Sequence, residues 1–172
     1  MPDFVQLLCR LVDGKVDFVL VGGLAAATHG CTLVTQDIDL CVNLALPNLE
    51  RLQRALADLH PVHRLTPRKI PFHHEATVLA ELKNIYLQTD WGQLDCLGDV
   101  KGLGDYRRVL TQSQTFDLNG RPCRILTLQA LITAKQAMNR PRDIETIRQL
   151  TVILELKKSA KTRKVIHPKT KS

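Results

Sequence analysis

Two aspartates stand one residue apart in an otherwise apolar stretch, DIDLCV, as Asp37 and Asp39. Because alternate side chains of a β-strand point to opposite faces, the two carboxylates would share one face of a strand, with Ile38 and Leu40 on the other. Two carboxylates this close repel each other and raise each other's pKa unless a cation joins them. Mg²⁺ commonly binds one or two carboxylates together with substrate phosphates. The pattern therefore indicates a divalent-metal site, although such a pair alone is also typical of turns and solvated strands.

Two glycines, Gly22 and Gly23, follow the apolar segment DFVLV and precede an alanine-rich segment that ends at Gly30. Glycine lets the backbone turn sharply and approach a ligand closely, and the start of a helix offers free N–H groups to a phosphate. A tight strand-to-helix turn is the other interpretation. The segment matches neither GxGxxG nor GxxxxGK[ST], so it supports neither a Rossmann site nor a P-loop.

A third carboxylate, Asp95, interrupts the apolar segment GQLDCL. If that segment forms a strand beside Asp37–Val42, all three carboxylates meet. Three carboxylates, a glycine turn and two divalent ions make up a phosphoryl-transfer site.

The elements that would position these residues follow from hydrophobic spacing and from turn and capping residues. A helix is expected between Asp3, its cap, and Gly14, and residues 60–74 form an irregular surface loop. The other expected elements are strands at 17–21 and 37–42, an alanine-rich helix ending at Gly30, a helix opening at Pro47, hairpins over 84–98 and 115–126, a brief helix YRRVL, a helix after Thr127 and a last helix from Pro141. The fold class is α/β (α+β), a mixed β-sheet flanked by helices, with C-terminal helices.

The net charge of +7 is concentrated at the end of the chain. From Lys157 onward there are seven Lys or Arg and no Asp or Glu, which leaves 17 basic and 17 acidic residues before it. We therefore expect one domain over 1–156 and a basic, disordered tail over 157–172 that is either simply solvated or contacts RNA.

The cysteines and the hydropathy bear on location. There are five cysteines, an odd number without CxxC spacing, and most stand in apolar surroundings. We interpret them as reduced core residues of a cytoplasmic protein. No apolar run approaches the roughly 20 residues of a membrane span, so no membrane association is expected.

Taken together, the segments VGGLAAATHG, TQDIDL, GQLDCL and LQALITAKQAMNRPRDIETIRQL resemble the nucleotidyltransferases of the DNA polymerase β superfamily, most closely the AbiEii-like toxin group. The resemblance covers roughly residues 18–150. It implies the nucleotidyltransferase fold and a magnesium-dependent enzyme that transfers a nucleotide from an NTP such as ATP to a hydroxyl of RNA, for example tRNA, or of a protein. It also implies a toxin or antitoxin partner.

The resemblance assigns roles to residues that match its motifs. Asp37, Asp39 and Asp95 would be catalytic and would ligate Mg²⁺, two ions in all. Five residues would bind the nucleotide: Gly22, Gly23, Lys135, Arg140 and Asp143. Asp143 would either meet the substrate or hold Lys135 or Arg140 in position.

The chain departs from the family at Leu33, where an Arg commonly stands two residues before the Thr of TxDID. The loss of a cation near the triphosphate leaves a second hypothesis open, a catalytically inactive protein of the same fold that binds nucleotides or a protein partner.

Overall fold

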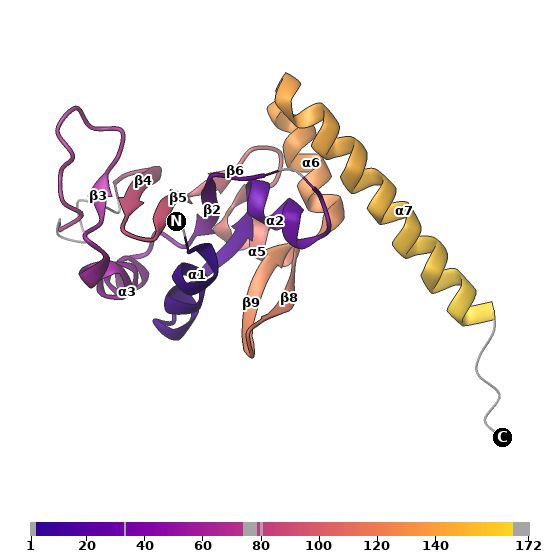
Figure 1. Ribbon diagram of the computed structural model, residues 1–172, viewed down its shortest axis with the longest axis horizontal. Helices are drawn as coiled ribbons and strands as arrows, with labels where there is room; N and C mark the ends of the chain where they lie inside the picture. The colour runs from indigo at the N-terminus through magenta and orange to yellow at the C-terminus, as the bar shows by residue number, and fades with distance from the viewer. Residues whose placement is uncertain (1–2, 33, 74–78, 80, 167–172) are drawn as a thin grey trace.

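A computed structural model describes residues 3–32, 34–73, 79 and 81–166, with side chains up to residue 160. Leu33 lies outside the described residues. The helices are α1 (Phe4–Asp13), α2 (Gly22–Thr28), α3 (Leu46–Leu56), η1 (Ala57–Leu59), α5 (Tyr106–Thr111), α6 (Leu128–Met138), η2 (Pro141–Asp143) and α7 (Ile144–Ile166). The strands are β1 (Phe18–Val21), β2 (Asp37–Val42), β3 (Val62–His63), β4 (Asn84–Thr89), β5 (Gly92–Leu97), β6 (Asp99–Val100), β7 (Gly104–Asp105), β8 (Ser113–Leu118) and β9 (Arg121–Leu126). Figure 1 shows this arrangement.

Seven strands form one mixed sheet in the order β3-β4-β5-β2-β1-β9-β8. The pair β1–β2 is antiparallel, whereas β2–β5 and β1–β9 are parallel. Strands β6 and β7 form a separate two-stranded sheet. The helices flank the sheet, and α6 and α7 pack against each other on the side of the molecule where β8 and β9 lie (Figure 1). The mixed sheet with C-terminal helices confirms the fold class predicted from the sequence.

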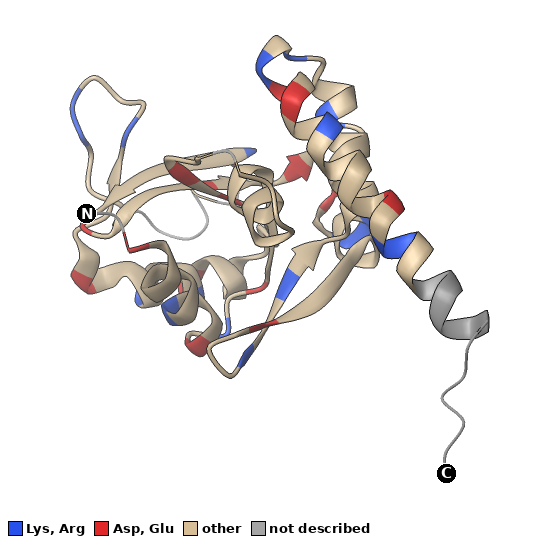
Figure 2. Ribbon diagram, turned by 45° about the vertical axis from the view of Figure 1, so that its right-hand side comes forward, with Lys and Arg blue, Asp and Glu red and all other residues tan. Residues whose placement is uncertain are grey.

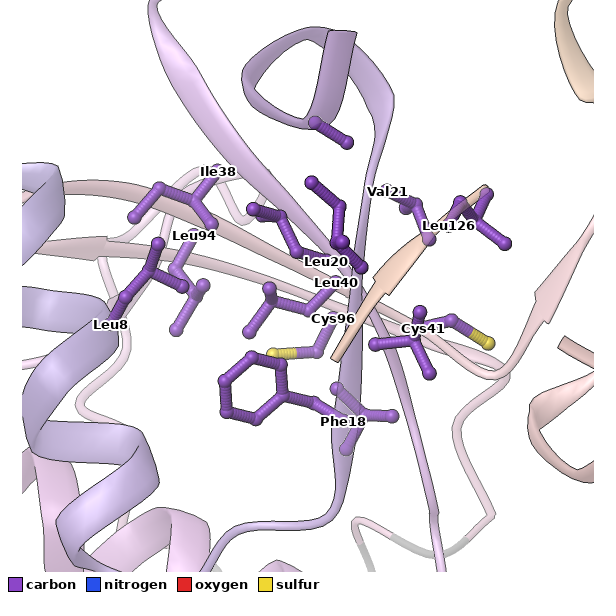
Figure 3. Packing of buried hydrophobic residues seen from close by; sticks show 14 of the residues in the cluster. Leu8, Phe18, Leu20, Val21, Ile38, Leu40, Cys41, Leu94, Cys96 and Leu126 are labelled. Atoms are coloured by element: carbon purple, nitrogen blue, oxygen red, sulfur yellow. The ribbon is translucent and has the colours of Figure 1, made fainter. Parts of the chain in front are cut away.

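One face of the central strands is apolar and carries the main core. Residues directly opposite each other in a ladder share a face, so Leu20, Leu40 and Cys96 form one row across β1, β2 and β5. All three are fully buried. Leu8 of α1 lies beside Ile38 and Leu94 of the same face (Figure 3). The opposite face of the same strands is mixed: it carries the buried residues Val19, Val21 and Cys41 together with Asp37, Asp39 and Asp95.

The end of the chain differs from expectation. The charge pattern predicts a disordered tail from Lys157, whereas α7 continues as a helix to Ile166. Both signs of charge occur along this helix, with Glu145 and Arg148 in its first half and Glu155 and Lys158 further on (Figure 2). Residues 167–172 lie outside the described part of the chain.

Two sequence-based expectations concern the cysteines and membranes. All five cysteines carry free thiols, and four of them are buried, as predicted. Among the described helices, none combines the length and the apolar character needed to cross a bilayer.

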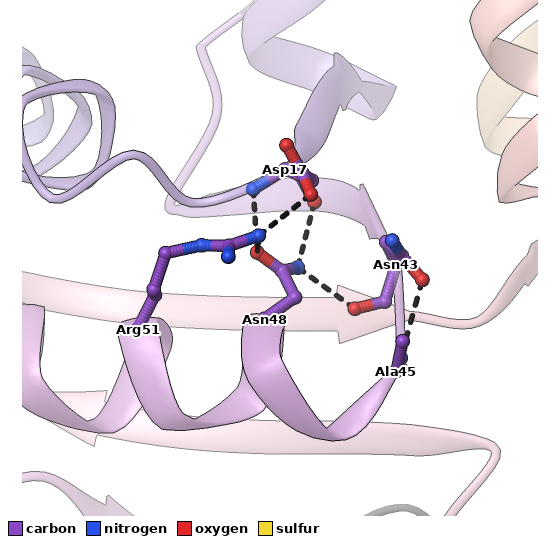
Figure 4. Close-up of polar contacts among 5 residues, drawn as sticks. All are labelled: Asp17, Asn43, Ala45, Asn48 and Arg51. Carbon is purple, nitrogen blue, oxygen red and sulfur yellow. Dashed lines mark hydrogen bonds and ion pairs between the residues drawn. The ribbon is translucent and has the colours of Figure 1, made fainter.

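Asn48, at the start of α3, joins this helix to two central strands (Figure 4). Its amide Nδ2 donates to the backbone carbonyls of Asp17 (3.0 Å) and Asn43 (2.7 Å). Its Oδ1 accepts from the backbone N–H of Asp17 (2.7 Å) and from Arg51 (3.0 Å). The side chain therefore fixes α3 against the residue before β1 and the residue after β2, under the apolar face of the sheet.

We predict that Asn48→Ala lowers the free energy of unfolding by about 3 kcal/mol, because it removes the four hydrogen bonds of a side chain that is itself buried. Asn43→Ala is the matched control, since the Asn43 side chain accepts one exposed hydrogen bond, from Ala45. It should cost about 1 kcal/mol or less. Urea unfolding of both variants measures the difference, and equal losses would contradict the role of Asn48.

Candidate active site

The mixed face of the sheet carries a row of five side chains. Strand register places Val21 opposite Asp39, Asp39 opposite Asp95, and Asp95 opposite Tyr86. Arg64 continues the row beyond β3, since its backbone N–H donates to the Tyr86 carbonyl at 3.0 Å. The row runs across β1, β2, β5 and β4, so the ladder itself holds two of the three predicted carboxylates side by side.

The three predicted carboxylates do converge. Asp37, Asp39 and Asp95 each place one oxygen so that the three oxygens lie within 4.8 Å of one another. Asp37 shares the face of Asp39 because the two residues alternate along β2. The parallel pairing of β2 with β5 brings Asp95 to them.

The electrostatics of the cluster show the cost of this crowding. Burial, followed by the charges of Asp37 and Asp95, raises the pKa of Asp39 from 3.8 to about 6. A hydrogen bond from the Gly23 backbone and the charge of Lys135 act in the opposite direction. Burial also raises the pKa of Asp95. A bound cation would relieve this repulsion.

Gly22 allows the backbone to pass against the cluster. Its φ is +65°, in the left-handed region, and a Cβ there would lie 2.0 Å from Oδ2 of Asp39. At Gly23, a Cβ would lie 2.7 Å from Oγ1 of Thr35. That hydroxyl donates to the backbone carbonyl of Asp37 at 3.1 Å. Both glycines are therefore required by close approach to the aspartates and their supporting threonine.

A cleft of about 880 Å³ opens over this face. It is lined by all eight residues that the sequence analysis named: Gly22, Gly23, Asp37, Asp39, Asp95, Lys135, Arg140 and Asp143. Further polar residues in its wall were not predicted: Thr35, Arg64, Asn84, Tyr86, Asp99, Lys101 and Arg142. Residues from six segments of the sequence thus share one cavity.

Lys135 and Asp143 form a buried ion pair at one side of the cleft. Nζ of Lys135 donates to Oδ1 of Asp143 at 2.7 Å, and each side chain is 8% exposed. Asp143 therefore holds Lys135 directly. Within the described part of the chain, Oδ2 of Asp143 is buried without a hydrogen-bond partner. An ammonium has three donors, so Lys135 keeps two for a ligand in the cleft.

Arg64 is the functional candidate that the sequence analysis missed. Its Nη2 lies 2.6 Å from both oxygens of Asp95, and its Nε lies 3.2 Å from Oδ1. The sequence predicts an irregular surface loop here, whereas Val62–His63 form a short strand that brings Arg64 to the sheet. The only local signal was the apolar Val62 before it, which is too short a pattern to predict a strand.

The residues present fit a divalent metal. The three clustered side chains are carboxylates, the hard oxygen donors that Mg²⁺ prefers. Burial and the neighbouring carboxylates raise the pKa of Asp39 to about 6, and a bound divalent cation would favour its ionised form. Asp37, Asp39 and Asp95 are therefore the residues that would hold the ion.

Several solved nucleotidyltransferase structures resemble this chain over most of its length. A protein of Thermotoga maritima assigned as a nucleotidyltransferase is 21% identical, with a TM-score of 0.53 over 84% of this chain and 87% of that one. The antibiotic-resistance factor ANT(2'')-Ia, in a crystal with adenylyl-2''-tobramycin, is 17% identical, with a TM-score of 0.54 over 89% and 88%. An antigenic nucleotidyltransferase-like protein of Paracoccidioides brasiliensis is 17% identical, with a TM-score of 0.55 over 88% and 73%. No protein-family model and no curated protein sequence matches the chain. The chain has the nucleotidyltransferase fold, which confirms the fold inferred from its motifs.

Gly22→Ala should destabilise the protein by about 3 kcal/mol, because it combines backbone strain with a clash against Asp39. Gly120→Ala separates the two effects: Gly120 also has a positive φ, +80°, but a Cβ there meets nothing within 4 Å. Strain alone should cost about 1–2 kcal/mol. The free energy of unfolding in urea measures both, and equal values would mean that the approach to Asp39 has no cost.

Asp39→Asn should stabilise the metal-free protein at pH 8, with the gain fading towards pH 4. The folded-state pKa of about 6 lies above the ordinary 3.8, so protonation favours the folded state. This contribution is complete below about pH 4 and is lost as the pH rises through about 6. Asparagine is neutral throughout, so the difference in unfolding free energy between variant and native chain should grow between these values. Urea titrations in EDTA test this, and a difference independent of pH would contradict it.

Proposed function

We propose that the chain is a Mg²⁺-dependent nucleotidyltransferase that transfers the NMP group of an NTP, such as ATP, to a hydroxyl acceptor. The observation that carries the proposal is the convergence of the Asp37, Asp39 and Asp95 oxygens within 4.8 Å, beside the Gly22 turn. The fold supports it, and one structure of that fold holds an adenylylated product, adenylyl-2''-tobramycin.

The three aspartates would hold the metal, two ions in the complete site. When bound, the metal neutralises charge that develops on the attacking and leaving oxygens. In the transfer, the acceptor hydroxyl oxygen bonds to the α-phosphorus while the bond to the β-phosphate oxygen breaks, and pyrophosphate leaves. Asp95 accepts the hydroxyl proton.

The remaining residues of the cleft would bind and orient the nucleotide. Gly22 and Gly23, which line the cleft beside the aspartates, would hold the triphosphate. Lys135, held by Asp143 at 2.7 Å, presents its remaining N–H groups to the phosphates, and Arg140 adds a second cation. Because Lys135 is fixed by a buried partner, its charge is positioned before the substrate arrives, which favours catalysis.

The acceptor we propose is an RNA, such as a tRNA, or a protein hydroxyl. Beyond the aspartate cluster and its partner Arg64, the cleft is lined by four basic residues, Lys101, Lys135, Arg140 and Arg142, and by two acidic residues, Asp99 and Asp143. This balance favours an anionic acceptor over a polycationic aminoglycoside. Membership of the AbiEii-like group, with a toxin or antitoxin partner, is the finer form of this proposal and rests on the sequence motifs. A cytoplasmic location is proposed from the number and spacing of the cysteines.

A second candidate function is nucleotide or partner binding without turnover. The Arg64–Asp95 ion pair favours it, because it occupies one of the three carboxylates. The absence of the family Arg at position 33 favours it as well. Calorimetric titration with NTP, with and without Mg²⁺, separates the two, since metal-dependent binding is expected of the enzyme.

With Mg²⁺ and α-³²P-labelled NTPs, we expect the native protein to label an RNA or protein acceptor. Asp39→Ala, or excess EDTA, should reduce labelling by more than about 100-fold, because the charge on the transferring phosphoryl group is then no longer neutralised.

Glu50→Ala is the matched control, since it removes an exposed carboxylate on α3, away from the cleft. It should label as the native protein does. Labelling by Asp39→Ala at the native rate, or the absence of any label on tRNA, total RNA and protein, would contradict the enzymatic proposal.

A further inference from the structure

Arg64 occupies a carboxylate of the candidate metal site. Its guanidinium binds Asp95 as a fork, with Nη2 at 2.6 Å from each oxygen and Nε at 3.2 Å from Oδ1. The Asp95 side chain is 9% exposed and that of Arg64 is 23% exposed, so water screens the pair poorly. This pairing is much stronger than a typical surface ion pair.

The backbone and an aromatic ring hold Arg64 at this position. Its N–H donates to the carbonyl of Tyr86 at 3.0 Å, which extends the sheet by one residue beyond β3. Its guanidinium carbon lies 5.4 Å from the centre of the Tyr86 ring, a cation–π contact. Tyr86 itself is opposite Asp95 in the β4–β5 ladder. The same register that gathers the aspartates therefore delivers a cation to them.

The guanidinium and a divalent ion need the same oxygens. Each carboxylate oxygen has two acceptor positions, and Oδ1 of Asp95 already accepts from two nitrogens of Arg64. Oδ2 of Asp95 accepts a third hydrogen bond, from Nη2 of Arg64. A divalent cation coordinated by Asp95 would also stand beside a fixed positive charge. Asp37 and Asp39 have no such restriction from Arg64.

We propose that Arg64 is the resident cation of the carboxylate cluster and competes with the divalent metal for Asp95. The inference rests on the proposed function of this site. Asp37 and Asp39 take the first ion without displacement, whereas coordination by Asp95 requires the guanidinium to move off its oxygens. Arg64 is a positioning residue in this scheme: it holds Asp95 in the metal-free state and sets the metal concentration at which the site is completed.

The test measures metal binding without nucleotide or turnover. Free Mn²⁺ is quantified by electron paramagnetic resonance during titration of the native protein, Arg64→Met and Arg68→Met. Removal of the competing cation should tighten Mn²⁺ binding by about tenfold, since a paired cation shifts the proton affinity of a carboxylate by that factor or more. Arg68→Met removes the same charge from an exposed side chain nearby, and its affinity should stay within about twofold of the native value.

The possible results separate a failure of the Arg64 competition from a failure of the proposed function. Tighter binding by Arg64→Met alone supports the competition, because a merely structural Arg64 would leave the ligands disordered and weaken binding. Equal or weaker binding by a folded Arg64→Met overturns the inference while the metal site stands. If neither the native protein nor Arg64→Met binds Mn²⁺ at millimolar concentration, both the proposed function and the inference are overturned.

Arg64→Lys is a second variant for the case in which Arg64→Met does not fold. Circular dichroism shows whether each variant is folded. Lysine keeps the charge but loses the two-pronged geometry. Its Mn²⁺ affinity should therefore lie between the native and Arg64→Met values, about threefold tighter than native. If Arg64→Met does not fold, native-like affinity of Arg64→Lys overturns the competition and tighter binding supports it.

Discussion

The candidate site depends on one constraint: the sheet holds three carboxylates together although their charges repel one another. Asp39 and Asp95 are opposite each other in a parallel ladder, and Asp37 is fixed to the same face by the alternation of β2. Their side chains are short, so they have little freedom to move apart. Burial of the apolar face on the other side of the same strands stabilises this arrangement. A strained charge cluster is thus maintained by packing that lies one sheet thickness away.

Two cations, one on each side, limit the cost of the cluster. Arg64 pairs with Asp95, and Lys135 lowers the pKa of Asp39 through its charge. Lys135 is itself paired with Asp143, so the two are buried together. Breaking such a pair by removing one partner is strongly destabilising, which explains why both residues must be present. The charged groups that stabilise the cluster therefore extend from Arg64, next to β3, to Asp143 in η2.

The sequence predicts those parts of the site that local patterns specify. The alternation in DIDLCV predicts β2, and Asn119-Gly120 predicts a hairpin turn in which both residues do have positive φ. The meeting of Asp95 with the other two aspartates depended on whether its strand lies beside β2, and the sequence of one segment does not show which strands are neighbours. Lys135 and Asp143 were found by resemblance alone. The chain ends a helix after Lys135 and forms a 3₁₀ turn that contains Asp143, so no periodic pattern predicts that the two side chains meet. Arg64 was missed because a two-residue strand has no periodicity.

The register of β5 against β4 is fixed by contacts at the turn of their hairpin. A slip of one residue against β2 would move Asp95 to the apolar face. At the turn, the Thr89 hydroxyl donates to the Gly92 carbonyl at 2.9 Å and accepts from the Trp91 N–H. The Trp91 carbonyl accepts from the Asp3 N–H at 2.9 Å, and Arg10 lies over its ring. The N-terminal segment therefore contacts the turn, and the turn sets the register of β5 against β4, which places Asp95 opposite Tyr86. Residues that do not line the cleft thus help to place Arg64, Tyr86 and Asp95 in one row.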